Sequence, residues 1–124
     1  MRPLPSEAPP FFWRAAARET FAGRAVIGRD EQTLFCVEPN GEVLAVDPDG
    51  VVPQRFVNAS ADHLARFLDV FAPAWRAWRD VGDLDAQQFV RELRERLERV
   101  DARALADGES FWSVVLEQMH DGLL

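Results

Sequence analysis

Lysine and tyrosine are absent from this sequence, and cysteine occurs once, as Cys36. A lone cysteine cannot form an internal disulfide bond, so the chain does not fit the class of small secreted domains held together by disulfides. Long apolar runs are also missing: none approaches the roughly 18 residues that cross a membrane, and residues 1–7 lack the apolar segment of a signal peptide. We therefore expect a cytoplasmic protein that binds no membrane.

Positive charge is scarce as well. The chain has 14 arginines and 21 acidic residues, which gives a net charge of −7 at pH 7. A negative field repels phosphate backbones and attracts basic partners. Direct binding of nucleic acid is therefore not expected, and a basic protein is the partner that this charge favours.

The chain does contain the material for a hydrophobic core. Apolar residues make up 48% of the sequence, including nine Phe and four Trp, and large aromatic side chains bury much surface when a domain folds. A length of 124 residues suits one domain. Four prolines fall within residues 1–10, which we interpret as a flexible lead-in, and we expect residues 11–124 to form a single α+β domain.

The middle third of the chain has the pattern of an antiparallel sheet. Its β-prone runs are residues 25–27, 34–37, 43–46 and 55–57. Asn40-Gly41 lies between the second and third runs and is a strong hairpin signal, because both residues accept positive φ. Residues 47–50 (Asp-Pro-Asp-Gly) predict a turn before the fourth run. Short links predict a β-meander of about four to six strands, covered on one face and partly on the other.

Helical patterns flank this sheet. Three alanines at 15–17 predict a short helix over residues 11–21, with Gly23 just beyond its end. Ser60 is placed to cap a helix over residues 61–71. Pro73 is expected to end or kink that helix, because its ring clashes with the carbonyl four residues earlier.

Two more helices are predicted in the last third. The first begins at Asp85 and carries an apolar stripe that includes Leu93 and Leu97. The second is capped by Asp107 and carries Trp112 on its apolar side. Helices of this kind are expected to flank the sheet and complete an α+β fold.

Residues that could carry chemistry are few. Cys36 lies in an apolar strand pattern, where a thiol is inert and has a raised pKa. Ser60 and His63 are three residues apart, but the cap explains Ser60 without a nucleophile. Residues 47–50 resemble the start of a calcium loop and lack the remaining ligands of one. We therefore expect no catalytic residue, no metal and no cofactor.

The surface offers two sets of candidate contacts with a partner. Trp75 and Trp78 follow Pro73 and lie beside arginines, so they are candidate apolar anchors. The second set is acidic and lies near the predicted hairpin tips. Its members are Asp30, Glu31, Glu38, Glu42, Asp47 and Asp49. A solvated edge that resists aggregation explains the acidic set equally well.

Several short segments occur together along the chain. They are Ile27-Gly28-Arg29-Asp30, Gly41-Glu42-Val43 leading to Val46-Asp47, Phe56-Val57-Asn58-Ala59-Ser60 leading to Leu64 and Phe67-Leu68, and the ending from Trp112 through Glu117-Gln118-Met119 to Gly122-Leu123-Leu124. This combination resembles the fourth family of SUKH immunity proteins. The resemblance covers residues 24–71 and 105–124. Its most specific element is the Phe-Val-Asn-x-Ser step into an amphipathic helix, which contains Asn58 and Ser60.

The resemblance implies a function by binding. It implies an antiparallel sheet flanked by helices, and a bacterial immunity protein of the cytoplasm that binds a cognate polymorphic toxin and blocks it. Asn58 and Ser60 then define the fold rather than touch the toxin, and no catalytic residue carries over. Many such toxins act on nucleic acids and are basic. An acidic inhibitor would associate rapidly with a basic toxin through electrostatic attraction.

Two other functions stay open at this point. The chain could be a general SUKH-type interaction or scaffold module with several partners and no toxin. It could also be an enzyme or a small-ligand binder that uses a cleft between sheet and helices, although no converging set of polar residues can be named. Self-association through the surface around Trp75 and Trp78 is a further possibility.

Overall fold

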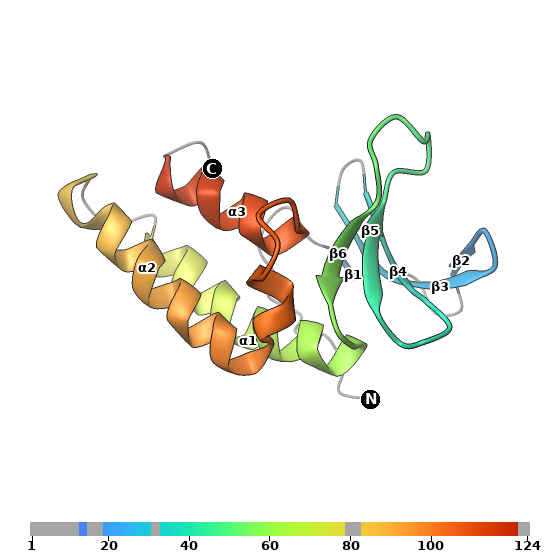
Figure 1. The fold of residues 1–124 in the computed structure, drawn as a ribbon, viewed down its shortest axis with the longest axis horizontal. Coiled ribbons are helices and arrows are strands. Elements are labelled where there is room, and N and C mark those ends of the chain that lie inside the picture. The colour runs from blue at the N-terminus through green and yellow to red at the C-terminus, as the bar shows by residue number, and fades with distance from the viewer. Residues whose placement is uncertain (1–12, 15–18, 31–32, 79–82, 122–124) are drawn as a thin grey trace.

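The computed structural model describes residues 13–14, 19–30, 33–78 and 83–121. In these residues an antiparallel sheet packs with one face against a layer of helices (Figure 1). The predicted α+β class is therefore confirmed. The predicted lead-in, residues 1–10, and Glu31 of the acidic set lie outside the described residues.

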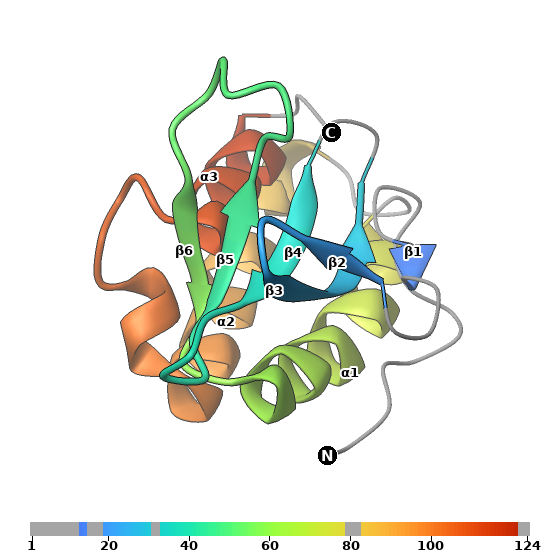
Figure 2. The ribbon, with the colours of Figure 1, turned by 90° about the vertical axis from the view of Figure 1, so that its right-hand side faces the viewer.

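The sheet has the strand order β1-β3-β4-β5-β6, with β2 paired to β3, and every described pairing is antiparallel. The strands are β1 (Trp13–Arg14), β2 (Thr20–Phe21), β3 (Arg24–Arg29), β4 (Leu34–Val37), β5 (Val43–Val46) and β6 (Arg55–Asn58). The predicted β-prone runs became β3 to β6, so the predicted meander is confirmed. Figure 2 looks at the sheet with the helices behind it.

The β4–β5 hairpin forms at the predicted place with a different turn. The N–H of Gly41 donates to the carbonyl of Glu38 over 2.8 Å, so the central residues of the turn are Pro39 and Asn40. Gly41 has φ +92°, whereas Asn40 is not among the residues with positive φ. The prediction of a two-residue turn with positive φ at both Asn40 and Gly41 is therefore wrong. The central residues of the turn begin with Pro39, and this turn needs positive φ only at its end.

The helix predicted over residues 11–21 is also wrong where the structure describes it. Trp13–Arg14 and Thr20–Phe21 are strands β1 and β2 on the edge of β3. Gly23, with φ +80°, and Ala22, with φ +51°, form a tight β2–β3 turn. The three alanines at 15–17 lie outside the described residues. At the described positions, pairing with β3 outweighs a local helix preference, which is a weak effect.

The helical layer consists of α1 (Ala61–Trp78), α2 (Asp83–Val100), the short 3₁₀ helix η1 (Ala102–Leu105) and α3 (Phe111–His120). The start of α1 is as predicted, and α2 begins two residues earlier than expected. Asp107 does not cap α3. Ser110 does, since its side chain accepts the N–H of Ser113, while Asp107 accepts the N–H of Glu109.

Pro73 lies inside α1, which continues to Trp78, so of the two predicted effects, an end or a kink near Ala72, the end is wrong and the kink stays a prediction. Proline costs a helix one hydrogen bond, but Pro73 is on the exposed side, where water can reach the freed carbonyl. The next residue, Ala74, is buried in the core. Burial of the residues beyond Pro73 outweighs the lost bond.

One continuous core joins the two layers. Phe35, from the inner face of the sheet, meets the ring of Phe111 edge-on at 5.0 Å. Trp112 of α3 is 1% exposed and lies within 5.4 Å of the rings of both Phe67 and Phe71. Aromatic pairs of this geometry add about 0.5–1.5 kcal/mol each beyond the area they bury. The core holds α3 firmly against one end of the sheet.

Candidate functional site

The junction of the two layers contains a buried polar network. Asn58, at the end of β6, is 0% exposed. Its Nδ2 donates to Oδ2 of Asp101 over 3.1 Å, and its Oδ1 accepts the indole N–H of Trp112 over 3.0 Å. The N–H of Ala59 donates to the same Asp101 oxygen over 2.9 Å. The network ties β6 to the end of α2 and the start of α3.

Ser60 caps α1, as predicted. Its hydroxyl oxygen accepts the N–H of His63 over 3.1 Å and lies 2.7 Å from Nδ1 of the same residue. Both contacts are local to the first turn of the helix. Asn58 and Ser60 therefore sit at the step from sheet to helix, where they stabilise the fold.

Cys36 has no access to solvent. Its side chain is 0% exposed, and burial raises the pKa of the thiol above its ordinary value of 9.0. The predicted burial of Cys36 in a strand is confirmed, and the inertness of its thiol stays a prediction. Within the described residues, His, Cys, Asp and Glu side chains nowhere gather in a group of three that could hold a metal ion.

The predicted aromatic anchors lie in the last two turns of α1. The rings of Trp75 and Trp78 stack with their centroids 5.5 Å apart, and Phe71 continues the stack from Trp75 at 6.3 Å. Both tryptophans are half-buried and pack against the core. Their contact with a partner stays a prediction, and only part of each ring is accessible for it.

The acidic residues that sequence placed at hairpin tips lie at two opposite ends of the sheet. Glu38 directly follows β4 and Glu42 directly precedes β5, so they flank the β4–β5 turn. Glu38 forms an ion pair with Arg24 at 3.3 Å, and Glu42 forms one with Arg103 at 3.3 Å. Each carboxylate at this end is therefore engaged within the protein.

Asp47 and Asp49 lie at the other end of the sheet, in the β5–β6 loop (residues 47–54). One carboxylate oxygen of Asp47 accepts the N–H of Asp49 over 2.9 Å, and the other accepts those of Val51 and Val52, each over 3.0 Å. The bonds from Asp49 and Val52 contribute most to a pKa of Asp47 below its ordinary value. Asp47 is thus ionised at neutral pH and holds the shape of the loop.

The β5–β6 loop displays two apolar side chains. Val51 is 81% exposed and Val52 is 46% exposed, and these are the exposed large hydrophobic residues of the described chain. Gly50, with φ +70°, closes the turn that precedes them by donating to the carbonyl of Asp47 over 3.0 Å. The predicted turn at residues 47–50 is confirmed, and its consequence is to project two valines into solvent.

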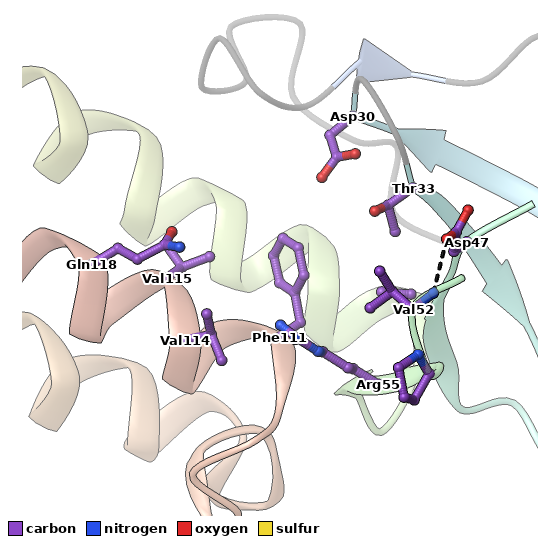
Figure 3. A pocket seen from close by; sticks show the side chains of 11 residues that line it. Asp30, Thr33, Asp47, Val52, Arg55, Phe111, Val114, Val115 and Gln118 are labelled. Atoms are coloured by element: carbon purple, nitrogen blue, oxygen red, sulfur yellow. Dashed lines mark hydrogen bonds between the residues drawn. The ribbon is translucent and has the colours of Figure 1, made fainter. Parts of the chain in front are cut away.

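A hollow of about 260 Å³ opens between this loop and α3 (Figure 3), and we name it the α3 hollow. Phe111, Val114 and Val115 of α3 form one wall, and Ala45 and Val52 contribute from the sheet and the loop. The lining is completed by Asp30, Thr33, Asp47, Pro53, Arg55 and Gln118. Apolar walls with a polar rim suit a large side chain that has a charged tip.

Figure 3 shows where the charged groups of the α3 hollow lie. Asp30 and Thr33, from the β3–β4 side, point into it, and Arg55, from β6, extends across it toward Phe111. A second hollow, of about 440 Å³, lies beside the same loop and shares Asp30, Asp47 and Val52 with the first. Val52 lines both depressions and Val51 lines the second, and each depression also has an arginine in its lining, Arg55 in the first and Arg29 in the second.

Sequence reasoning found the acidic part of this site and missed the rest. Asp30, Asp47 and Asp49 were candidates, whereas the exposed valines and the α3 wall were not. A signal was present: residues 50–53 (Gly-Val-Val-Pro) place an apolar pair between two strand breakers, where it is too short for a buried strand.

Comparison with known proteins identifies a family. The model of the SUKH-4 immunity protein family matches residues 4–118. Comparison with curated proteins and with solved structures gave no match. Within the described residues, every helix is too short or too polar to span a bilayer.

Proposed function

Because the chain belongs to the SUKH-4 immunity protein family, we propose that it binds a cognate bacterial protein toxin and neutralises it by covering the surface with which the toxin works. The observation that carries this proposal is the extent of the family match, residues 4–118 of 124. The match includes the buried Asn58 network, both ends of the sheet and most of α3.

The charge of the chain supports a basic toxin as the partner. A toxin that acts on nucleic acid needs positive charge to bind phosphate. A net charge of −7 on the inhibitor attracts such a protein over about 10 Å at physiological salt and raises the rate of association. Ionised Asp47 and exposed Asp49 place part of this charge where a partner can reach it.

Neutralisation by occlusion requires no chemistry from the chain. The Ser60 hydroxyl is engaged as a helix cap, and the Cys36 thiol is buried with a raised pKa. A stable inhibitory complex needs a surface of about 1,600 Å² buried in total, which a domain of this size can supply from one end of its sheet and the adjoining helix. We therefore propose a non-catalytic inhibitor that acts one to one.

Co-expression tests the proposal. The candidate toxin to test is the C-terminal domain encoded by the gene immediately upstream, expressed alone and together with this chain under separate promoters. We expect growth arrest from the toxin alone, rescue by this chain and co-purification of the pair. A chain unfolded by Asn58→Ala plus Leu97→Asp, at matched expression, serves as the negative control. Arrest that the wild-type chain does not relieve would refute the proposal.

A further inference from the structure

We propose that the toxin is bound at the sheet end formed by the β5–β6 loop, with Val51 and Val52 as apolar contacts and the α3 hollow as the socket for an arginine or lysine side chain of the toxin. This inference rests on the proposed function and adds the surface and the chemistry of recognition. The helices α1 and α2 and the β4–β5 end of the sheet lie outside this contact.

The exposed valines are the first observation behind it. A single exposed apolar residue on a protein surface needs no explanation. Here two adjacent valines, 81% and 46% exposed, lie on one loop, and the large apolar residues of the other described loops and helices are better covered. Their exposure costs free energy in the unbound protein and is recovered when a partner covers them.

The loop is also ordered before the partner arrives. Three backbone N–H groups of the loop, from Asp49, Val51 and Val52, donate to the carboxylate of Asp47. A contact surface that already has its bound shape loses little conformational entropy on association. The valines are therefore presented by a preorganised loop.

Charge defines what enters the α3 hollow. Asp30, ionised Asp47 and Arg55 line it, so its carboxylates outnumber its one cation, and Asp49 adds a third carboxylate on the exposed loop. The walls are apolar, from Phe111 and Val115. Arginine and lysine combine an apolar stem with a positive head, so the stem can lie along these walls while the head meets the carboxylates.

Two other occupants fit less well. Small-molecule sites usually exceed about 300 Å³ and enclose most of the ligand, whereas the α3 hollow has about 260 Å³ and opens beside a projecting loop. A second copy of this chain would bring its own three carboxylates against these three in a two-fold contact, and like charges oppose that association. A basic protein is the occupant that the surface favours.

A pair of charge-matched variants tests the proposal. Asp49→Arg and Glu95→Arg both change the net charge by two units, so they weaken long-range attraction equally, but Glu95 lies on the exposed side of α2. With the upstream-encoded toxin domain as the titrant, we expect Asp49→Arg to raise Kd about tenfold or more, and Glu95→Arg less than about threefold. Equal effects of the two variants would overturn the proposal.

Two further variants test each part of the contact. Val51→Ser should raise Kd about fivefold or more without changing the melting temperature, since its side chain is exposed. Arg55→Gln removes a positive charge from the hollow, so binding of a cation should tighten or stay unchanged. Weaker binding of Arg55→Gln would show that the hollow receives an anionic group and would overturn this assignment.

The outcomes separate this inference from the function on which it rests. One outcome is that the wild-type chain neutralises the toxin while Asp49→Arg, Val51→Ser and Arg55→Gln all bind it as tightly as the wild type does. In that case the proposed function stands and the proposed surface is wrong. If the wild-type chain neither binds nor neutralises the toxin, the function fails and the inference fails with it. A wild-type dimer in sedimentation that Val51→Ser dissociates would assign the valines to self-association and overturn the proposal.

Discussion

The side chain of Asn58 makes the central hydrogen bonds at the junction between the sheet and the helical layer. It donates to Asp101 and accepts from Trp112, whose side chain is 1% exposed. A buried polar group without a partner costs about 1–3 kcal/mol, and more beside a charged group. Replacing Asn58 would therefore leave two groups of the core unsatisfied rather than remove one bond.

We expect Asn58→Ala to lower the free energy of unfolding by about 2–4 kcal/mol. Ser60→Ala removes only the cap of α1 and should cost about 1 kcal/mol. Urea unfolding followed by tryptophan fluorescence measures both variants against the wild type. Equal losses in the two variants would contradict a role for the network beyond that of a helix cap.

A second effect at the scale of one residue is the pH-dependent contribution of Asp47 to the stability of the β5–β6 loop. Backbone N–H bonds hold the pKa of its carboxyl below the ordinary value of 3.8, so the folded value lies below the unfolded one. The stabilisation of the loop is therefore complete at neutral pH and is lost as the pH falls below 3.8 and through the folded pKa.

The amide protons of Val51 and Val52 report this titration by NMR. We expect their chemical shifts to change together with a midpoint below 3.8. Asp47→Asn, which cannot ionise, should abolish the transition and speed hydrogen exchange of both amides about tenfold. A midpoint at or above 3.8 would contradict the account of the loop.

At the scale of elements, α1 continues through a proline that the sequence alone predicts to end or kink it. Proline inside a helix costs about 3 kcal/mol relative to alanine, offset by about 0.4–1 kcal/mol because it restricts the unfolded chain. Pro73 is exposed, so a substitution there disturbs no core contact.

Pro73→Ala is accordingly expected to raise the free energy of unfolding by about 2 kcal/mol. Pro39→Ala is the matched control, because Pro39 occupies a turn position that suits its φ and its loss should cost up to about 1 kcal/mol. Thermal and urea unfolding of both variants check the opposite signs. A loss of stability in Pro73→Ala would mean that the proline shapes α1.

The elements that sequence predicted well are those set by local patterns. The β-prone runs became β3 to β6, and Ser60 caps α1 as its position indicated. The elements predicted wrongly depend on distant partners. β2 exists because Thr20 and Phe21 pair with β3, and α1 passes Pro73 because its far end packs on the core. Neither effect has a local pattern in the sequence.

The candidate site shows the same division. The acidic residues were visible in the sequence, but their separation into two ends of the sheet follows from strand direction. The α3 hollow brings Asp30 beside Phe111, residues far apart in the chain, and only the packed fold places them together. The role of Asn58 also needed Asp101 and Trp112, which lie 43 and 54 residues away.

At the scale of the whole molecule, the net charge of −7 makes association with a basic toxin dependent on salt. Raising NaCl from about 50 mM to about 500 mM should lower the association rate constant about tenfold, with a smaller change in the dissociation rate constant. Stopped-flow fluorescence of the four tryptophans can follow the reaction. A rate constant that does not change with salt would contradict electrostatic steering.

The central claim is that this chain neutralises its toxin by direct binding, and calorimetric titration of the purified toxin domain with the purified chain tests it most directly. We predict one chain bound per toxin with a Kd of about 1 nM or below, as expected for a protein inhibitor of this interface size. Absence of a complex at about 10 μM of each protein would contradict the claim.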